Sequence, residues 1–303
     1  MTGPLRLGTR RSPMATTQSG LVAARLTELT GRAVELVGVT TFGDVTKGDL
    51  AQMGGTGVFV SALRDKLIEG AVDFAVHSLK DLPTAPDPRI ALVAIPPRDD
   101  HRDALVAGAK LADLPSGSKV GTGSPRRIAQ LRALRPDLEY VPIRGNADTR
   151  IGKVASGELQ GVVLAAAGLR RLGREAEIAQ FFEVDEMLPA PGQGALAVEI
   201  RADRADLADL LGVLDDAATR AAVTAERAVL NALEAGCAAP VGAHSVVTGQ
   251  DLNLTAAVIA VDGARAVRKS TAGSSSTAMD LGRALAAEMI AEGAGTLMGE
   301  QPQ

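Results

Sequence analysis

Cysteine, tryptophan and tyrosine are almost missing from this sequence. Its 303 residues include one cysteine, one tyrosine, five phenylalanines and no tryptophan. A single thiol excludes an intramolecular disulfide, so nothing indicates an oxidising compartment. Few aromatic side chains are available for the stacking platforms that bind single-stranded nucleic acid. We therefore expect no nucleic-acid partner.

Further absences narrow the class of protein. No apolar run approaches the roughly 20 residues that span a bilayer, and the N-terminal stretch MTGPLRLGTRRSP lacks the apolar core of a signal peptide. One cysteine and three scattered histidines give no zinc-ligand spacing. A GxxxxGK[ST] phosphate loop is also missing. We expect a cytoplasmic globular protein without a membrane or metal partner.

Positive charge is concentrated in one segment, although the net charge is −4. Between Lys119 and Arg174, nine Arg and two Lys stand against two Asp and two Glu, which gives +7 and leaves −11 for the remainder. Nucleic-acid-binding proteins are usually basic overall. A basic segment within an acidic chain favours a local anion site instead.

Short β-rich runs alternate with helical patterns over the first two hundred residues, as in an α/β domain with a largely parallel sheet. LRLGT, AVELVGVTT, VDFAVHS and IALVAIP predict strands, while SPMATTQSGLVAARLTELTG and VFVSALRDKLIEG predict helices. After PPRDDHRD (96–103), which resembles a hinge, the rhythm restarts. ALAVEIR is a strand that could return to the first lobe. From about Asp216 a long helix, two strands and a last helix predict a small α+β domain.

The stretches GTRRSPMATTQ (8–18) and GTGSPRRIAQ (121–130) are alike. Both read as a strand, Gly-Thr, Ser-Pro and a helix, and serine at the N-cap with proline at the first helical position is a strong helix start. Two similar lobes joined by crossing hinges would enclose a cleft. Ligands in such sheets bind outside the carboxyl ends of the strands, where both Ser-Pro turns fall.

Several arginines stand at these strand ends and helix starts. Cations are disfavoured in the first turn of a helix, so Arg126 and Arg127 suit a place where an anion binds. Arg10, Arg144, Arg150 and Arg171 have similar positions. Arginine forks recognise carboxylates in bidentate fashion, which indicates a ligand with several carboxylates. The alternative is a set of solvated surface arginines.

The stretch VHSLKDLP (76–83) places Lys80 and Asp81 directly after a strand, where ionisable groups can act on a ligand. A simple Lys–Asp pair at a turn is the alternative. His77 reads as a packed strand residue. TFGDVTKGDLAQMGGTGVF (41–59) is long for a connection and is typical of an active-site lid, unless it is a loop without function.

Six stretches together resemble the porphobilinogen deaminase family, also called hydroxymethylbilane synthases: GTRRSP, VHSLKDLPT, GTGSPRR, RGNADTR, LPAPGQGALAVE and EAGCAAPVGA. They follow the family's order and spacing from Leu5 to about Gly293. The resemblance implies an α/β fold of two lobes like those of type II periplasmic binding proteins, with crossing hinges and a small α+β third domain. The implied domains are 1–97 with 195–214 (possible lid 42–58), 98–194, and 215–303.

The resemblance also implies the chemistry. Cys237, among small residues that give access, aligns with the cysteine that holds a dipyrromethane cofactor by a thioether. Four porphobilinogen molecules are condensed head to tail on it, with release of ammonia, into hydroxymethylbilane in tetrapyrrole and heme biosynthesis. Asp81 aligns with the catalytic aspartate, which stabilises the azafulvenium cation and moves protons. The family expectation is a monomer.

The remaining site residues carried over by the resemblance fall into two sets. Lys80 is catalytic and, with Asp81, contacts the cofactor. Further cofactor-binding positions are Thr122, Ser124, Arg126, Arg127 and Arg144. Substrate-binding positions are Arg10, Ser12, Gln18, Phe59, Arg150, Arg171 and Gln193. Three positions depart from the family pattern: Thr56 and Ser61 replace lysines in the lid, and Gly123 replaces a serine.

Two functions of other classes remain open on the residues alone. A non-catalytic anion-binding module would need the arginines but neither Asp81 nor Cys237. A carboxylate-binding regulator would need a DNA-binding segment, and no helix-turn-helix pattern precedes the first strand.

Overall fold

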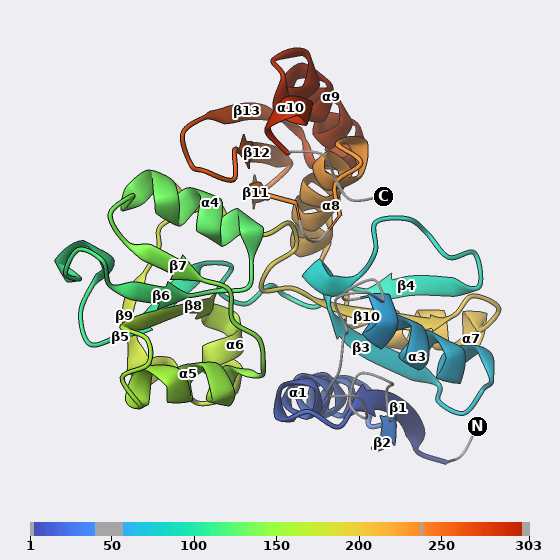
Figure 1. Cartoon of the computed structure of the whole chain (residues 1–303). Helices are drawn as coiled ribbons and strands as arrows, with labels where there is room; N and C mark the ends of the chain where they lie inside the picture. Colours follow the sequence, from blue (N-terminus) through green and yellow to red (C-terminus); the bar gives the residue numbers. More distant parts are fainter. Residues whose placement is uncertain (1–2, 40–56, 237–238, 299–303) are drawn as a thin grey trace. The chain divides into compact units, whose positions relative to one another are not determined.

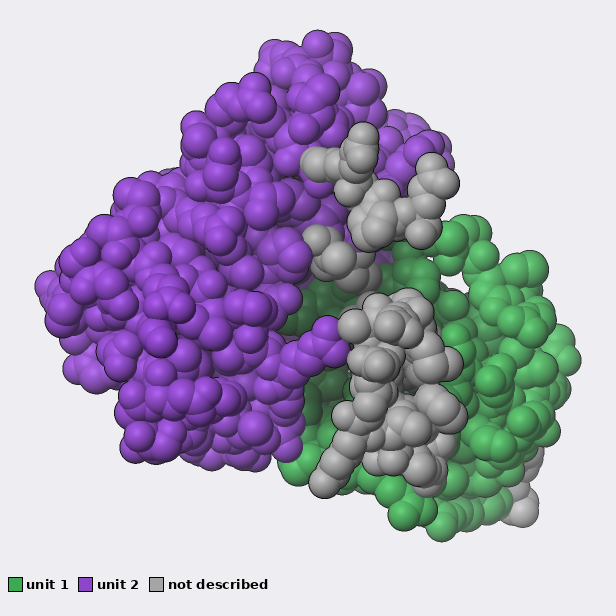
Figure 2. Space-filling view, viewed as in Figure 1, with its two compact units in different colours: residues 1–98, 195–220 green, residues 99–194, 221–303 purple. Residues whose placement is uncertain are grey.

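The computed structural model describes residues 3–39, 57–236 and 239–298. The chain divides into two compact units, residues 1–98 with 195–220, and residues 99–194 with 221–303 (Figure 2). It therefore passes from the first unit to the second after residue 98 and returns after residue 194. In the described part of the chain, no helix is long and apolar enough to cross a membrane.

The first unit contains a five-stranded sheet in the order β2-β1-β3-β10-β4 (Figure 1). Its strands are β1 (Leu5–Arg10), β2 (Val34–Val39), β3 (Phe74–Ser78), β4 (Ile90–Ala94) and β10 (Leu196–Arg201). Its helices include α1 (Pro13–Thr30), α3 (Gly57–Ile68) and α7 (Ala205–Gly212). Strands β1, β2 and β3 are parallel, whereas β10, the first strand after the return, runs antiparallel to β3 and β4.

Alternation along these strands gives the sheet two apolar faces. On one face Leu7 and Phe74 pack with Leu26 of α1 in a buried cluster. On the other face Leu63 and Leu67 of α3 are buried with Ala75. A Cβ at Gly8 would lie 3.0 Å from a methyl group of Val72 and 3.3 Å from one of Leu63, so glycine lets α3 approach β1 closely.

The second unit repeats this arrangement in a five-stranded sheet of order β7-β6-β8-β5-β9. Its strands are β5 (Asp103–Ala107), β6 (Lys119–Gly121), β7 (Glu139–Val141), β8 (Gly161–Ala165) and β9 (Ile178–Phe181). Its helices include α4 (Pro125–Leu134), α5 (Ala147–Ala155) and α6 (Ala166–Arg171). Again the antiparallel strand, β5, is the first one after a crossing.

Residues beyond 220 add a three-stranded antiparallel sheet, β11-β12-β13, with its own buried core. Its strands are β11 (Val241–Thr248), β12 (Asp251–Ile259) and β13 (Ala266–Ser274). The helices of this part are α8 (Ala217–Ala232), whose first four residues belong to the first unit, α9 (Ala278–Ala291) and α10 (Ala294–Leu297). The fold class is the expected one, with two similar α/β sheets joined by two crossings and a small α+β part.

Both predicted Ser-Pro helix starts are confirmed. Ser12 caps α1 and Ser124 caps α4, each with proline in the first turn and each with its hydroxyl accepting a backbone N–H. The side chains thereby satisfy donors that the helix itself cannot.

Candidate active site

A pocket in the first unit lies at the carboxyl ends of β1 and β3, with walls from α1 and α3. The sequence predicted four of its lining residues as site residues: Arg10, Ser12, Gln18 and Asp81. It is also lined by His77, which the sequence indicated only as a packed strand residue. The structure thus gathers a carboxylate, a guanidinium and several hydrogen-bonding groups around one hollow.

Asp81 lies in a single 3-10 turn, η1 (Leu79–Asp81), directly after β3. The backbone fixes this turn, because Leu79 N donates to Ala195 O at 3.0 Å and Leu82 N donates to Leu79 O at 3.1 Å. Lys80 and Asp81 are both half-buried. Their side chains therefore stand on a short, constrained segment rather than on a free loop.

The wall formed by α1 is joined to β3 by a side-chain hydrogen bond. Gln18 is buried, and its Nε2 donates to Ser78 Oγ at 3.0 Å. Ser12, the N-cap of α1, uses its hydroxyl to accept the N–H of Ala15 at 3.3 Å. Ser12 thus serves the helix start while lining the pocket.

A buried carboxylate lies behind the pocket, on the face of the sheet that α3 covers. Glu199 of β10 accepts hydrogen bonds from Arg64 Nη2 at 2.7 Å and Arg64 Nε at 3.0 Å. Its Oε2 also lies 3.3 Å from Nε2 of His77. Burial alone would raise the pKa of Glu199, but contacts with His77 and Arg64 outweigh it and lower the pKa to about 2.

In the second unit, Arg126 and Arg127 turn inward and share one carboxylate. Arg126 Nη1 lies 2.7 Å from Asp103 Oδ2, and Arg127 Nη2 lies 2.7 Å from Oδ1. Arg126 Nη1 also donates to Leu188 O at 2.6 Å, and Arg127 Nη1 to Val163 O at 2.9 Å. Burial favours the neutral acid, yet the two guanidinium charges hold the pKa of Asp103 well below its usual range.

The turn before α4 is tight. Thr122 is fully buried, and its hydroxyl accepts the N–H of Ser124 at 3.4 Å. A Cβ at Gly123 would lie 2.8 Å from the carbonyl oxygen of Ile143. The departure from serine at position 123 therefore suits the close approach of these two backbone segments.

Arg144 and Arg150 have no acidic partner in the described part of the chain. Arg144 is exposed, and Arg150 Nε donates to the carbonyl of Gly145 at 2.8 Å. Burial and the neighbouring charge of Arg127 lower the pKa of Arg150. A half-buried guanidinium beside another cation, with only a carbonyl as partner, is suited to binding an anion.

The chain crosses between the units in two segments, one beginning at Asp99 and the other ending at Gly194 on the side of the second unit. The last two predicted substrate residues, Arg171 and Gln193, lie where these crossing segments meet within the second unit. Arg171 Nη2 donates to Gly194 O at 2.6 Å, and its Nε lies 3.3 Å from Asp99 Oδ2. Gln193 Nε2 donates to His101 O at 2.8 Å and to Asp103 Oδ1 at 2.9 Å.

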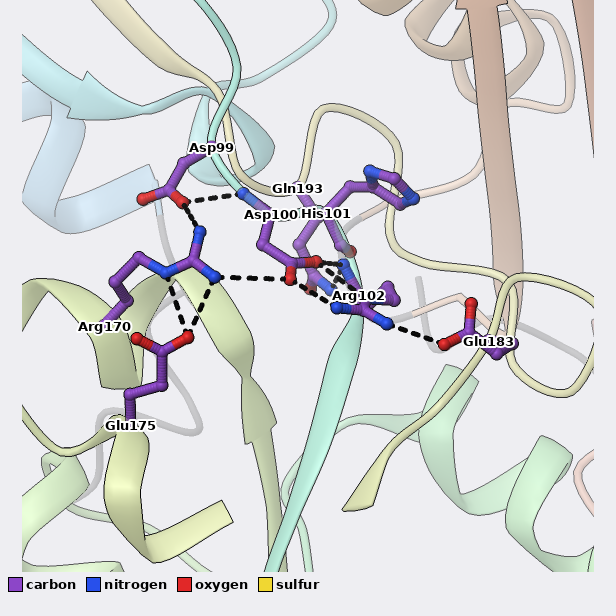
Figure 3. A network of polar contacts seen from close by, with 8 residues as sticks. All are labelled: Asp99, Asp100, His101, Arg102, Arg170, Glu175, Glu183 and Gln193. Carbon is purple, nitrogen blue, oxygen red and sulfur yellow. Dashed lines mark hydrogen bonds and ion pairs between the residues drawn. The ribbon is translucent and has the colours of Figure 1, made fainter. Parts of the chain in front are cut away.

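Figure 3 shows the acidic groups of the first crossing arranged around arginines. Arg170 Nη1 lies 3.0 Å from Asp99, and Arg102 bridges Asp100 and Glu183. These contacts fix the first crossing segment, and those of Arg171 and Gln193 link it to the second. Arg171 and Gln193 thus have a structural role in addition to the substrate-binding role that the sequence predicts for them.

Several expectations fall outside the described residues. Cys237, Thr56 and most of the possible lid (42–58) are among them, as is the side chain of Phe59. Ser61, at the other position where the family has lysine, is exposed on α3.

Comparison with known proteins decides the family. Residues 5–209 match the model described as "Porphobilinogen deaminase, dipyromethane cofactor binding domain", and residues 220–291 match "Porphobilinogen deaminase, C-terminal domain". The chain belongs to the porphobilinogen deaminase family.

Relatives named porphobilinogen deaminase are similar over nearly all of the chain. The Thermobifida fusca protein is 60% identical over 310 residues, which cover 99% of this chain and 97% of that protein. Porphobilinogen deaminase 1 of Streptomyces coelicolor is 57% identical, covering 99% and 98%. Among solved structures, the methionine-binding protein MetQ is 11% identical with a TM-score of 0.45, covering 69% of this chain and 89% of that one.

Sequence reasoning missed three charged residues of these clusters: Asp103, which pairs with Arg126 and Arg127, and Glu199 with its partner Arg64 beside His77. One signal was visible for Glu199, because it is the charged residue inside the apolar run ALAVEI. Charged side chains are rarely fully buried without a partner, so such an interruption indicates a buried ion pair. Nothing in the sequence identifies Arg64 as that partner, 135 residues earlier.

Proposed function

We propose that this chain condenses four porphobilinogen molecules head to tail into hydroxymethylbilane, releasing one ammonia for each. The observation that carries the proposal is the first-unit pocket, in which Asp81 and Arg10 stand together at the carboxyl ends of the strands. A carboxylate beside hydrogen-bonding and cationic groups suits a substrate that bears carboxylates and passes through a cation. We further propose that the protein works as a monomer in the cytoplasm.

Asp81 is the catalytic residue of this proposal. In each cycle the C–N bond of the aminomethyl group breaks, and the amine leaves as ammonia after taking up a proton. The carboxylate of Asp81 accepts hydrogen bonds from the pyrrole N–H and stabilises the positive charge left on the ring. A C–C bond then forms to the free α-carbon of the growing chain, whose proton is lost. Asp81 can carry that proton, and Lys80 beside it binds carboxylates.

Arg10, Ser12 and Gln18 hold the substrate in this proposal. Arg10 pairs with a substrate carboxylate, and Ser12 lies at the N-terminus of α1, the end of a helix that attracts anions. The proposal also assigns substrate binding to Phe59, Arg150, Arg171 and Gln193. Arg171 and Gln193 contribute by fixing the crossing segments that they contact.

A dipyrromethane attached to Cys237 supplies the primer on which the product grows. The second unit contains residues that fit its carboxylates, because Arg144 and Arg150 have no acidic partner in the part of the chain that the structure describes. Thr122 and Ser124 shape the turn next to them. Arg126 and Arg127 supply positive potential there while Asp103 fixes their orientation. We also propose residues 215–303 as the domain that presents the cysteine.

Intact mass and turnover test this function together. The purified protein should exceed its sequence mass by one dipyrromethane, and the excess should be absent from Cys237→Ser. Asp81→Ala should keep the excess mass but lose at least about 100-fold in turnover, because electrostatic stabilisation and proton transfer each contribute that much. An unmodified mass without pyrrole colour would instead support an anion-binding module. A rate above a tenth of wild type in Asp81→Ala would refute the role of Asp81.

A further inference from the structure

Side chains hold the end of β3 on both faces of the sheet, immediately before the turn that carries Asp81. Successive strand residues point to opposite faces. Ser78 accepts a hydrogen bond from Gln18 on the face of α1. His77 points to the face of α3, where its Nε2 lies 3.3 Å from Glu199.

The register of the sheet brings His77 and Glu199 together. In the antiparallel pair of β3 and β10, His77 lies opposite Ala197. Glu199, two residues further along β10, therefore points to the same face and is a diagonal neighbour of His77. Helix α3 covers this face and adds Arg64, which contacts both oxygens of Glu199.

The geometry of this cluster is restrictive. The Glu199 side chain is 3% exposed and that of His77 is 5% exposed, so both groups are largely shielded from water. A bidentate arginine–carboxylate contact fixes the plane of the carboxylate as well as its distance. Removing one member of a buried ion pair leaves an uncompensated charge, which the surrounding structure must move to accommodate.

We propose that Arg64, Glu199 and His77 form a positioning network that fixes the end of β3 and thereby orients Asp81 in the pocket. The inference rests on the proposed function, since it assigns the network to that reaction. His77 lines the pocket together with Asp81, while Arg64 and Glu199 act through His77 and the strand. Asp81 follows His77 by four residues, and the backbone between them is the constrained turn η1.

A second arginine–carboxylate pair with a buried acid provides a control, although its arginine is more exposed, with 41% of the Arg6 side chain accessible against 14% for Arg64. Asp73 directly precedes β3, at the end of the strand away from the pocket, and is 3% exposed. Arg6 contacts both of its oxygens, with Nη2 at 2.9 Å from Oδ1 and Nε at 3.2 Å from Oδ2. Neither residue lines the pocket. Loss of this pair should cost stability without reorienting Asp81.

The test compares Glu199→Gln with Asp73→Asn in steady-state turnover of porphobilinogen and in thermal unfolding. Rates are normalised to the fraction of protein that carries the pyrrole by intact mass. We expect both variants to unfold at lower temperature. Glu199→Gln should lower kcat by about tenfold or more with KM changed less than threefold, because a misplaced catalytic group affects the chemical step most. Asp73→Asn should leave kcat within about twofold.

Arg64→Lys and Arg64→Met extend the test if Glu199→Gln folds poorly. Lysine keeps the charge but loses the fork, so kcat should fall less in Arg64→Lys than in Arg64→Met. Equal kcat losses in Glu199→Gln and Asp73→Asn, an effect on KM alone, or unchanged kcat in both Glu199→Gln and Arg64→Met would overturn the network. Failure of the proposed function gives a different result, namely wild-type protein without pyrrole mass or turnover.

Discussion

Gly123 occupies a position in which any side chain would meet a neighbouring backbone. An added Cβ would lie 2.8 Å from the carbonyl of Ile143, and that oxygen cannot rotate away as a side chain could. We expect Gly123→Ala to lower the free energy of unfolding by about 1–3 kcal/mol, the usual cost of overpacking. Urea unfolding measures it.

Gly152→Ala is the matched control in the same unit. Gly152 lies within α5, and an added Cβ there would meet nothing within 4 Å. Alanine should raise the free energy of unfolding by up to about 1 kcal/mol, through helix propensity and a less flexible unfolded chain. Equal stability of both variants would show that the turn before α4 relaxes around a methyl group.

Among single residues, the sequence predicted those whose place follows from local pattern. Asp81 follows a strand, and Ser12 and Ser124 precede helices, so their positions could be derived from neighbours in the chain. The partners of Arg126 and Arg127 could not be derived this way. Asp103 precedes them by 23 and 24 residues and reaches them only because β5 runs antiparallel beside β8.

Among the elements, the long helices and the strands of the first sheet were predicted, whereas β5, β9, β13, α6, α7 and α10 were not assigned. Of these, β5, β9 and α6 have five, four and six residues. Segments so short carry fewer than two turns of a helical pattern and about two repeats of a strand pattern. Their state is decided by pairing across the sheet, as in the contacts of β5 with β8 and β9.

The two crossing segments make an element-scale prediction, because they touch at Gly194. This residue has φ +89°, and an added Cβ would lie 2.6 Å from Asp99 O. Gly173 also has a positive φ, +68°, but has open space around it. Backbone strain alone should cost Gly173→Ala about 1–2 kcal/mol, so Gly194→Ala should lose more in urea unfolding. Equal losses would show that the crossing segments separate easily to admit a methyl group.

At the scale of the whole molecule, the basic segment from Lys119 to Arg174 is largely neutralised by local pairing. Six of its nine arginines contact a carboxylate: Arg126, Arg127, Arg135, Arg170, Arg171 and Arg174. Two of these acids, Asp99 and Asp103, precede the segment. The sum of charges within the segment therefore did not include them. In the described residues, three arginines of the segment have no carboxylate contact: Arg132, Arg144 and Arg150. The region that offers uncompensated positive charge to an anion is therefore smaller than the sequence predicted.

Residues 221–298 have their own core, yet Glu226 joins them to the second crossing. Its side chain is fully buried, with Oε2 accepting Gly192 N at 2.7 Å and Oε1 accepting Ser245 N at 2.8 Å. In Glu226→Gln one of these N–H groups would face an NH2 group and lose its acceptor. We expect the free energy of unfolding to fall by about 1–3 kcal/mol, the cost of a buried unsatisfied donor. Glu288→Gln, whose carboxylate is 61% exposed, should change it by less than about 1 kcal/mol.

Hydrogen exchange read by mass spectrometry locates this effect in the molecule. If Glu226 joins the two parts, amides near Gly192 and in the first half of β11 should exchange faster in Glu226→Gln, while β1 and β3 keep wild-type protection. Faster exchange in the first unit as well would mean that Glu226 stabilises the whole chain rather than one junction. Unchanged exchange at β11 would mean that the α+β part is held to the rest of the second unit by its other contacts, such as the adjacent rings of His101 and His244, whose centroids lie 3.9 Å apart.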